Sequence, residues 1–439
     1  MASEPGQADA ATAPVTVLAS HDATPGQPPG RRAAGMPFIL IAVLIDMVSV
    51  GLIIPVLPAF IGSFTGSQAD QAFWYGAVAF AFGFASFLSG PILGGLSDRY
   101  GRRPILLLGF AGVAFSFFAI SLATTLWLMV AARLVAGAMQ ANIAVAQAYV
   151  ADITPPAQRA ARFGLLGAMF GIGYTLGPVV GGLLGSIDLR LPFYVAGALA
   201  LMNTLYGLFV LPESLTAARR QPFDWKRANP VAGFRALLSL GGVGPLVWVI
   251  ALSGLAQFVM HMSWVLYTTF KFGWGPKENG WSLFAVGVMA ALVQGGLLKT
   301  LLKRFTAQRL VVLGLISSTL CYAAWGLATE GWMMVVIIGC NLFGFTATVA
   351  LQSLMSNAAG NEEQGRTMGS IASLNSLMGV AAPIIAALLL GLVSHRPPGD
   401  VWLGLPFFFC ALLQGMAAVA ALRHFRRHPG PGRPAAALP

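Results

Sequence analysis

The chain has 439 residues, of which 57% are hydrophobic and only 9% are charged. A soluble domain carries about a quarter charged residues, so we expect most of this chain to lie in lipid. The formal net charge is +11. Because the basic residues are scattered between apolar runs, this charge indicates membrane flanks and argues against nucleic-acid binding. The three cysteines lie inside apolar runs at no metal or redox spacing, so we expect no disulfide, metal or cofactor: Cys321, Cys340 and Cys410.

Apolar stretches long enough to cross a bilayer, about 20 residues each, recur along the chain. They predict an all-α membrane protein with twelve transmembrane helices. The expected spans cover residues 37–61, 72–95, 104–124, 126–151, 160–185, 191–211, 244–270, 280–301, 308–328, 332–356, 367–393 and 402–422. Residues 1–36 lack an apolar stretch and predict a disordered tail rather than a signal peptide, and residues 426–439 predict a second tail.

The basic residues predict how the spans are oriented. With both termini in the cytoplasm, the internal segments hold 21 of the 26 lysines and arginines. The external loops then hold four, namely Arg190, Lys271, Lys277 and Arg396, and Arg133 lies within a span. Positive charge collects on the cytoplasmic side of membrane proteins, so we expect both termini to be cytoplasmic.

A polar linker, residues 212–243, divides the chain into two halves, residues 37–211 and 244–425. The halves repeat some residues at an offset of 205 positions: Trp127 and Trp332, Gly164 and Gly369, Pro178 and Pro383. Two parallel repeats of six spans predict two pseudo-symmetric bundles, which is an architecture of secondary transporters.

Asp46 lies in "LIDMVSVGLIIPVLP", nine residues into the first expected span. That position is about 14 Å deep, near the middle of the bilayer. A carboxylate there costs about 2.5–3.5 kcal/mol on insertion scales, and such groups usually line a transport pathway. We interpret Asp46 as a proton carrier, and the alternative is a fixed structural partner for a neighbouring helix.

Two further ionisable residues fall inside expected spans. Arg133 lies about 10 Å from the outer end of its span and needs an acceptor. Asp46 is the only deep carboxylate expected in the N-terminal half, so an ion pair or a water-bridged contact would let Arg133 tune its proton affinity. Alternatively, Arg133 caps backbone carbonyls or extends outward. His261 either relays protons or binds substrate, or it hydrogen-bonds a neighbouring helix.

Uncharged residues of the spans are also candidates for substrate binding or for contacts between helices. Six buried amides are expected to bind substrate or to join helices: Asn142, Gln147, Gln257, Asn341, Gln352 and Asn375. The fifth span carries a glycine at every fourth position, with a proline beside them that bends the helix: Gly173, Gly177, Pro178, Gly181 and Gly185. This stripe predicts tight packing, a hinge or sliding surface between the halves, or both.

The short loop "GGLSDRYGRRP", residues 94–104, gathers one acid and three arginines between two apolar spans. It matches the pattern G-x-L-x-D-R-x-G-R-R of the major facilitator superfamily at Gly94, Leu96, Asp98, Arg99, Gly101, Arg102 and Arg103. "RLVAG" (133–137) and "GYTLGPVVGG" (173–182, ending in Gly181 and Gly182) resemble the fourth- and fifth-helix motifs of its drug:proton antiporters. "DMVSVGLIIPVLP" (46–58) resembles the first helix of bacterial tetracycline efflux proteins.

The resemblance implies a monomeric transporter of the bacterial inner membrane that exchanges protons for a small amphipathic drug. It implies that the loop latches the two halves together on the cytoplasmic side in the outward-facing state. Asp98 would accept from the N-terminus of a facing helix, and Arg102 or Arg103 would pair with Asp152. The alternative is that these charges only orient the chain, which explains the arginines but not Asp98 or the glycines.

The chain also departs from the tetracycline exporters it resembles. Ser116 and Ser318 stand where those proteins carry acids in spans three and nine, and the second copy of the loop, "LLKRFTAQR" (301–309), lacks the acid and the glycine. The substrate is therefore open between a tetracycline-like compound and another drug. Further alternatives are export or uptake of a metabolite, or a channel or receptor. A channel should show a polar stripe or charged ring, which the spans lack, and no motif indicates an enzyme.

Overall fold

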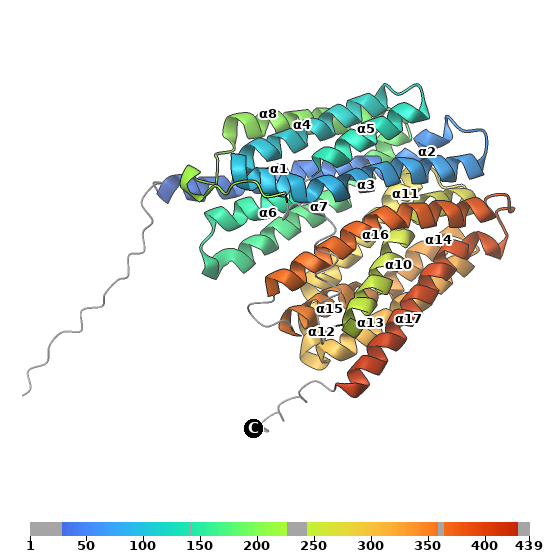
Figure 1. Cartoon of the computed structure of the whole chain (residues 1–439). Coiled ribbons are helices and arrows are strands. Elements are labelled where there is room, and N and C mark those ends of the chain that lie inside the picture. Colours follow the sequence, from blue (N-terminus) through green and yellow to red (C-terminus); the bar gives the residue numbers. More distant parts are fainter. Residues whose placement is uncertain (1–28, 141, 226–243, 359–363, 429–439) are drawn as a thin grey trace, which may run out of the picture.

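The computed structural model describes residues 29–140, 142–225, 244–358 and 364–428, and no strand occurs among them (Figure 1). The elements of the N-terminal half are α1 (Pro29–Ile53), α2 (Leu57–Gly62), α3 (Gln68–Tyr100), α4 (Arg102–Ser121), α5 (Leu126–Met139), α6 (Asn142–Ile153), η1 (Pro156–Gln158), α7 (Arg159–Gly185) and α8 (Leu191–Val210). The linker contains η2 (Ala217–Arg219). The C-terminal half comprises α10 (Gly244–Phe272), α11 (Pro276–Leu292), η3 (Val293–Leu297), α12 (Leu298–Arg304), α13 (Ala307–Leu327), α14 (Gly331–Cys340), α15 (Gly344–Ala358), α16 (Gln364–Val393), η4 (Val401–Gly404) and α17 (Leu405–Arg427).

The prediction of twelve spans is confirmed. Eleven helices of the described residues are long and apolar enough to cross a membrane, and the bent pair α14 and α15 makes a twelfth span. Helix α1 begins at Pro29, inside the segment predicted as an N-terminal tail. The rest of that tail, residues 1–28, lies outside the described residues, as do residues 226–243 of the linker and residues 429–439 of the predicted C-terminal tail.

Three of the expected continuous spans are interrupted. The first span breaks between α1 and α2, where Pro55 and Pro58 cannot donate the backbone bonds of a continuing helix. The fourth is divided into α5, which ends at Met139, and α6, which begins at Asn142, and the tenth breaks at residues 341–343 with a bend of 41°. The last two breaks occupy similar positions in the two halves. In secondary transporters such interrupted helices mark the region of binding and coupling.

The two halves meet on the side of the molecule opposite the linker (Figure 1). Here α3 packs against α16 and α7 packs against α11. A Cβ added to Gly83 would lie 2.7 Å from the carbonyl oxygen of Gly379, and one added to Gly280 would lie 2.5 Å from that of Pro178. The halves therefore touch backbone to backbone, which only glycine permits at these positions.

On the linker side the same faces are apart. Along α7, the face that meets α11 at Gly182 continues through Gly171 and Gly164, since residues three and four apart share a face. A Cβ added at Gly171 or Gly164 would meet nothing within 4 Å. The structure is thus closed on the side opposite the linker and open on the linker side.

The glycine stripe of α7 packs mainly inside the N-terminal half. A Cβ at Gly181 would lie 1.9 Å from the carbonyl oxygen of Leu52, and one at Gly173 would lie 2.6 Å from the Cβ of Met47, both on α1. The contact with the other half is made instead by Pro178 and Gly182. The predicted tight packing is therefore present, but the stripe itself faces α1 rather than a sliding surface between the halves.

The orientation can be tested with two single cysteines placed in a background whose three native cysteines are replaced by serine. Ala217 in the linker and Ala69 at the start of α3 are both exposed, on opposite sides of the bundle. We expect an impermeant maleimide added to whole cells to label the Ala69→Cys variant and to spare the Ala217→Cys variant. The opposite pattern would show that the linker is external.

Candidate functional site

Asp46 lies on α1 at its contact with α6 and is only 1% exposed. The Nδ2 group of Asn142 donates to both carboxylate oxygens, at 3.3 Å each. Asn142 is itself 3% exposed and is the first residue of α6, directly after the break in the fourth span. Among the described residues no other group hydrogen-bonds or ion-pairs with Asp46. A buried carboxylate without a cation is costly as an ion, so binding a proton stabilises this site.

Arg133 does not reach Asp46. Its guanidinium lies over the ring of Phe82 on α3, 5.6 Å from the ring centroid, and its Nε has no partner among the described residues. Helix α5 presses against α3 at this level, since a Cβ at Gly137 would lie 2.3 Å from the carbonyl oxygen of Phe82. No direct ion pair between Arg133 and Asp46 is among the described contacts, because Arg133 faces α3 and Asn142 bonds Asp46. The water-bridged contact stays a prediction.

Three of the six predicted amides come together in the C-terminal half. Gln257, Gln352 and Asn375 line a cavity of about 130 Å³ between α10, α15 and α16, together with apolar side chains such as Phe258. His261 lies one turn beyond Gln257 on the same face of α10. It is half-buried and has no hydrogen-bond or ion-pair partner in the described part of the chain.

The other three amides lie apart from this cavity. Asn142 bonds Asp46, as described above. Asn341 is buried at the break of the tenth span, where its Oδ1 accepts a hydrogen bond from Ser317 at 3.1 Å. Gln147 is exposed on α6. Asn142 and Asn341 thus join helices in this structure, and the cavity brings together the other three amides named above; substrate binding by any of the six stays a prediction.

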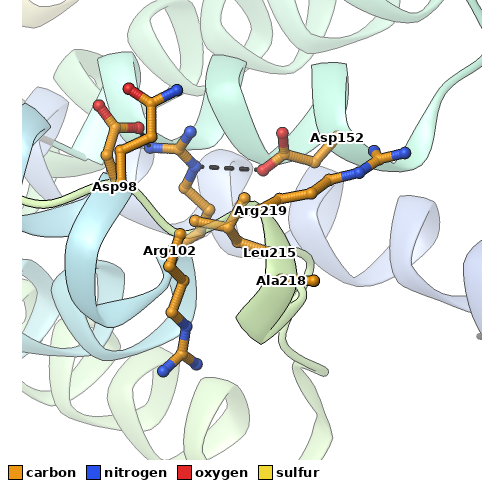
Figure 2. Close-up of a pocket in the computed structure, with 8 residues that line it drawn as sticks. Asp98, Arg102, Asp152, Leu215, Ala218 and Arg219 are labelled. Atoms are coloured by element: carbon orange, nitrogen blue, oxygen red, sulfur yellow. Dashed lines mark hydrogen bonds and ion pairs between the residues drawn. The ribbon is translucent and has the colours of Figure 1, made fainter.

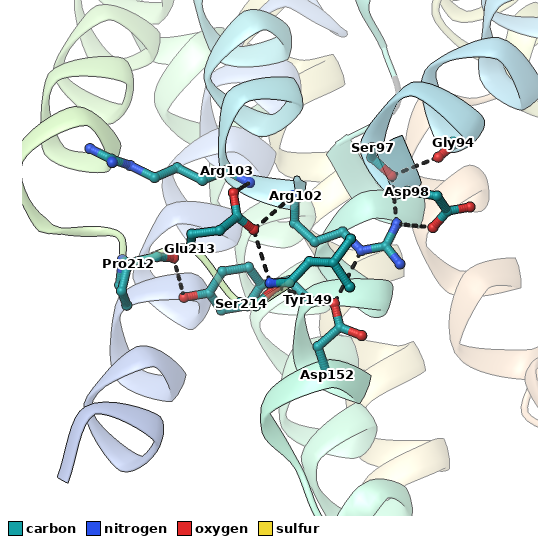
Figure 3. A network of polar contacts seen from close by, with 11 residues as sticks. Gly94, Ser97, Asp98, Arg102, Arg103, Tyr149, Asp152, Pro212, Glu213 and Ser214 are labelled. Atoms are coloured by element: carbon teal, nitrogen blue, oxygen red, sulfur yellow. Dashed lines mark hydrogen bonds and ion pairs between the residues drawn. The ribbon is translucent and has the colours of Figure 1, made fainter. Parts of the chain in front are cut away.

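The charged loop forms a polar network centred on Arg102 (Figure 3). Its Nη1 lies 2.5 Å from Oδ1 of Asp98 and donates to Oγ of Ser97 at 2.6 Å. Its Nε lies 3.1 Å from Oδ2 of Asp152, at the end of α6. The structure therefore brings Arg102 and Asp152 together as the resemblance implied.

The side chains of the other two arginines of the loop point away from this network. Arg99 is exposed, with its guanidinium 5.1 Å from the ring centroid of Tyr100. Arg103 donates through Nη2 to the carbonyl oxygen of Leu208, near the end of α8. Of the two possible partners for Asp152, the structure thus selects Arg102.

Glu213, which follows the sixth span, is a member of the network that the sequence analysis missed. Its carboxylate accepts hydrogen bonds from the backbone N–H groups of Arg102 at 2.9 Å and Arg103 at 3.2 Å, and so caps the N-terminus of α4. Gly101 has φ of 109°, and a Cβ there would lie 2.3 Å from Oε2 of Glu213. The loop therefore requires glycine for both its backbone and this contact. No local signal in the sequence pointed to Glu213, because the N–H groups that it caps lie more than 100 residues away.

The first part of the linker is docked onto the same network. Ser214 donates to Oδ2 of Asp152 at 3.2 Å, and the backbone N–H of Gln221 donates to the carbonyl oxygen of Asp98 at 3.1 Å. Between linker and loop lies a cavity of about 540 Å³ (Figure 2), lined by Asp98, Arg102, Asp152, Leu215, Ala218, Arg219, Arg220 and Gln221. We call Asp98, Arg102, Asp152 and Glu213 the gate network.

All described contacts of the gate network lie within the N-terminal half and the linker. The predicted latch to the other half belongs to the outward-facing state, whereas the halves are apart on this side here. The latch therefore stays a prediction.

Fold and sites together define a polytopic membrane transporter built from two related bundles. Residues 39–383 match the family model described as Major Facilitator Superfamily. The chain is 35% identical over 385 residues to the class C tetracycline resistance protein of Escherichia coli, a match covering 88% of this chain and 95% of that protein. It is 34% identical to the class D tetracycline resistance protein of Salmonella ordonez, and this match covers 87% of this chain and 98% of that protein. The chain belongs to the major facilitator superfamily.

Solved structures share this fold at low sequence identity. The nucleoside transporter NupG, in a D323A mutant, superposes with a TM-score of 0.71 at 13% identity, covering 89% of this chain and 99% of that one. A bacterial homologue of the human lysosomal transporter Spinster, in an inward-facing and unoccupied conformation, superposes with a TM-score of 0.69 at 17% identity. The match covers 91% of this chain and 98% of that one. The human organic anion transporter MFSD10 superposes with a TM-score of 0.65 at 22% identity, and the match covers 90% of this chain and 100% of that one.

The gate network can be tested through Asp98, whose side chain is 46% exposed. Exposed ion pairs contribute about 0–1 kcal/mol to stability, so Asp98→Asn should leave membrane abundance near normal. A coupling of 1–3 kcal/mol between sites changes equilibria about 5–150-fold, so we expect transport, measured in vesicles, to fall roughly tenfold.

The matched control is Asp400→Asn, on the opposite side of the bundle. Asp400 pairs with Arg396 at 3.2 Å with the same spacing of four residues, and asparagine keeps its helix cap. This control should transport normally. Full transport by Asp98→Asn would leave the loop charges with an orienting role only.

Proposed function

We propose that the protein is a proton-coupled exporter of a tetracycline-like or other amphipathic drug, acting as a monomer in a bacterial inner membrane with its linker and both termini in the cytoplasm. The relatives named tetracycline resistance proteins cover nearly the whole folded chain. The observation that carries the proton coupling is Asp46, a buried carboxylate in the first span whose described partner is one neutral amide.

The cavity between α10, α15 and α16 is the proposed drug site. Its amides supply uncharged donors and acceptors beside apolar surface, which suits an amphipathic molecule with several polar groups. The positions where tetracycline exporters carry further acids hold Ser116 and Ser318, both buried here. We therefore assign proton binding to Asp46. Spans three and nine supply no acid at these positions that could bind a charged group of the drug.

The cycle follows from which faces are open. With the linker side open, the drug enters from the cytoplasm. Outward opening parts the glycine contacts between α3 and α16 and between α7 and α11, while the linker side closes. The drug then leaves and a proton reaches Asp46 from outside. The membrane potential contributes about 2.3 kcal/mol per charge per 100 mV to the inward passage of that proton.

The test replaces Asp46 by Asn, which keeps the shape of the side chain and removes its titratable proton. The variant should insert normally, since a neutral amide costs less in lipid than a carboxylate. Tetracycline uptake into inverted vesicles, driven by a proton gradient, should fall to the level of empty vesicles. The control Asp188→Asn changes an exposed loop acid and should transport normally.

Two results would contradict the proposal. If Asp46→Asn accumulates tetracycline against its gradient with unchanged pH dependence, Asp46 is not the proton carrier, and His261 becomes the first residue to test. If the wild type moves no drug of a resistance panel in cells lacking their own exporters, the substrate is a metabolite instead.

A further inference from the structure

We propose that Asn142 is a positioning residue through which the proton state of Asp46 acts on the gate network, with α6 as the rigid connection between them. The inference rests on the proposed function, because it takes Asp46 to be the proton carrier. It gives Asn142 a role in coupling rather than in binding the drug.

The first step is the amide of Asn142 itself. Its Nδ2 donates to both oxygens of Asp46, while its Oδ1 is buried and has no partner among the described residues. When Asp46 binds a proton, its new O–H group becomes a donor and needs an acceptor. The orphaned Oδ1 is such an acceptor on the same side chain. A half-turn of the amide reverses the hydrogen bond, and the only covalent change is the O–H bond formed on Asp46.

The amide packs directly against the backbone of α4. Gly109 on α4 faces it so closely that an added Cβ would lie 1.8 Å from Oδ1 of Asn142. Ser116, two turns further along α4, is fully buried and its hydroxyl has no described partner. Glycine at position 109 thus leaves room that any side chain would fill.

The second step is the length and the two ends of α6. The helix runs for 12 residues, from Asn142 to Ile153. Asn142 stands at its first position, and Asp152, ten residues on, lies about 15 Å away along the axis. Asp152 holds Arg102 and Ser214 of the gate network and linker. Helix α5 ends at Met139, before α6 begins, so the proposal takes α6 to move as a helix of its own.

The C-terminal half supports the assignment by contrast. It has the same kind of break, between α14 and α15, and Asn341 is buried there too. However, Asn341 accepts from the hydroxyl of Ser317, and no carboxylate contacts it among the described residues. Among the described residues, the amide beside the break in the N-terminal half bonds an acid and the one in the C-terminal half does not, so the proposal assigns the proton response to the first.

Other ionisable groups near α1 do not compete for this role. Within the described residues, none on the helices packed against α1 hydrogen-bonds or ion-pairs with Asp46. On α6, α7 and α8 these groups are Tyr149, Asp152, Arg159, Arg162, Tyr174, Tyr194 and Tyr206, and α5 contributes Arg133. A pH response that depends on both Asp46 and Asn142 therefore reports on this contact.

The experiment compares two buried asparagines that both bond α1. Asn203 on α8 is 0% exposed, its Nδ2 donates to the carbonyl oxygen of Ala42 at 2.9 Å, and its Oδ1 is also without a described partner. It differs from Asn142 in not touching Asp46. Asn142→Leu and Asn203→Leu thus each remove a buried amide that bonds α1. Asn142→Leu removes the bond to Asp46, and Asn203→Leu leaves that bond in place.

The readout is a cysteine replacing Ala168, which is exposed on α7 between Gly164 and Gly171 in the opening on the linker side. Its rate of reaction with a maleimide is followed over a pH series in inverted vesicles lacking drug. The reference is a cysteine replacing Ala217 in the exposed linker, which corrects for the pH dependence of the reagent.

We expect the corrected rate to change with pH in the wild-type background and in Asn203→Leu. In Asn142→Leu the pH response should shrink at least about fivefold, the lower end of ordinary coupling between sites. If Asn142→Leu does not accumulate, Asn142→Ala, which removes the amide without adding bulk, is used with the same expectation.

A wild-type pH response in the Asn142 variant would overturn the proposal. A wild-type pH response in Asp46→Asn would instead refute Asp46 as the proton carrier, whatever Asn142 does. A loss of response in Asn203→Leu as well would also overturn it, since the loss of any buried amide that bonds α1 would then abolish the response.

Discussion

The structure depends on one buried contact, the hydrogen bond from the Asn142 amide to the carboxylate of Asp46. A carboxylate at this depth needs either a proton or a donor, and the chain supplies a single neutral donor. Several features meet at this point. The fourth span breaks so that its next residue faces α1, and Gly109 leaves room for the amide. Helix α6 then runs from the contact to the gate network.

The contacts between the two halves differ on the two sides of the molecule. Opposite the linker, glycines let the backbones of the two halves touch, which makes that seal depend on packing rather than on charge. On the linker side the polar contacts of the loop stay within one half. Arg102 joins α3, α4 and α6 through Asp98 and Asp152, and Glu213 ties the linker to the same point. The second half has lost the acid and glycine of its loop copy, so the two halves are alike in fold but not in charge.

Composition and hydropathy predicted the twelve spans, because that signal is local in the sequence. The family resemblance implied that Arg102 or Arg103 pairs with Asp152, and the structure shows Arg102 in that place. The interruptions between α5 and α6 and between α14 and α15 were missed because the spans were judged by hydropathy, although Asn142 and Asn341 lie at these places. Arg133 was expected near Asp46 because Asp46 was the only deep carboxylate expected in that half, whereas the structure places Asn142 against it. Glu213 was missed because its partners are backbone N–H groups more than 100 residues away, which no side-chain pattern reveals.

The most direct test of the central claim is a distance measured across the opening. Spin labels at Ala157, beyond the end of α6, and at Arg304, at the end of α12, are both exposed on the linker side. Double electron–electron resonance should show a distance distribution that changes with pH in the wild-type background. In Asp46→Asn the distribution should be the same at every pH. An equal pH dependence in both proteins would contradict the claim that a proton on Asp46 drives the movement of the halves.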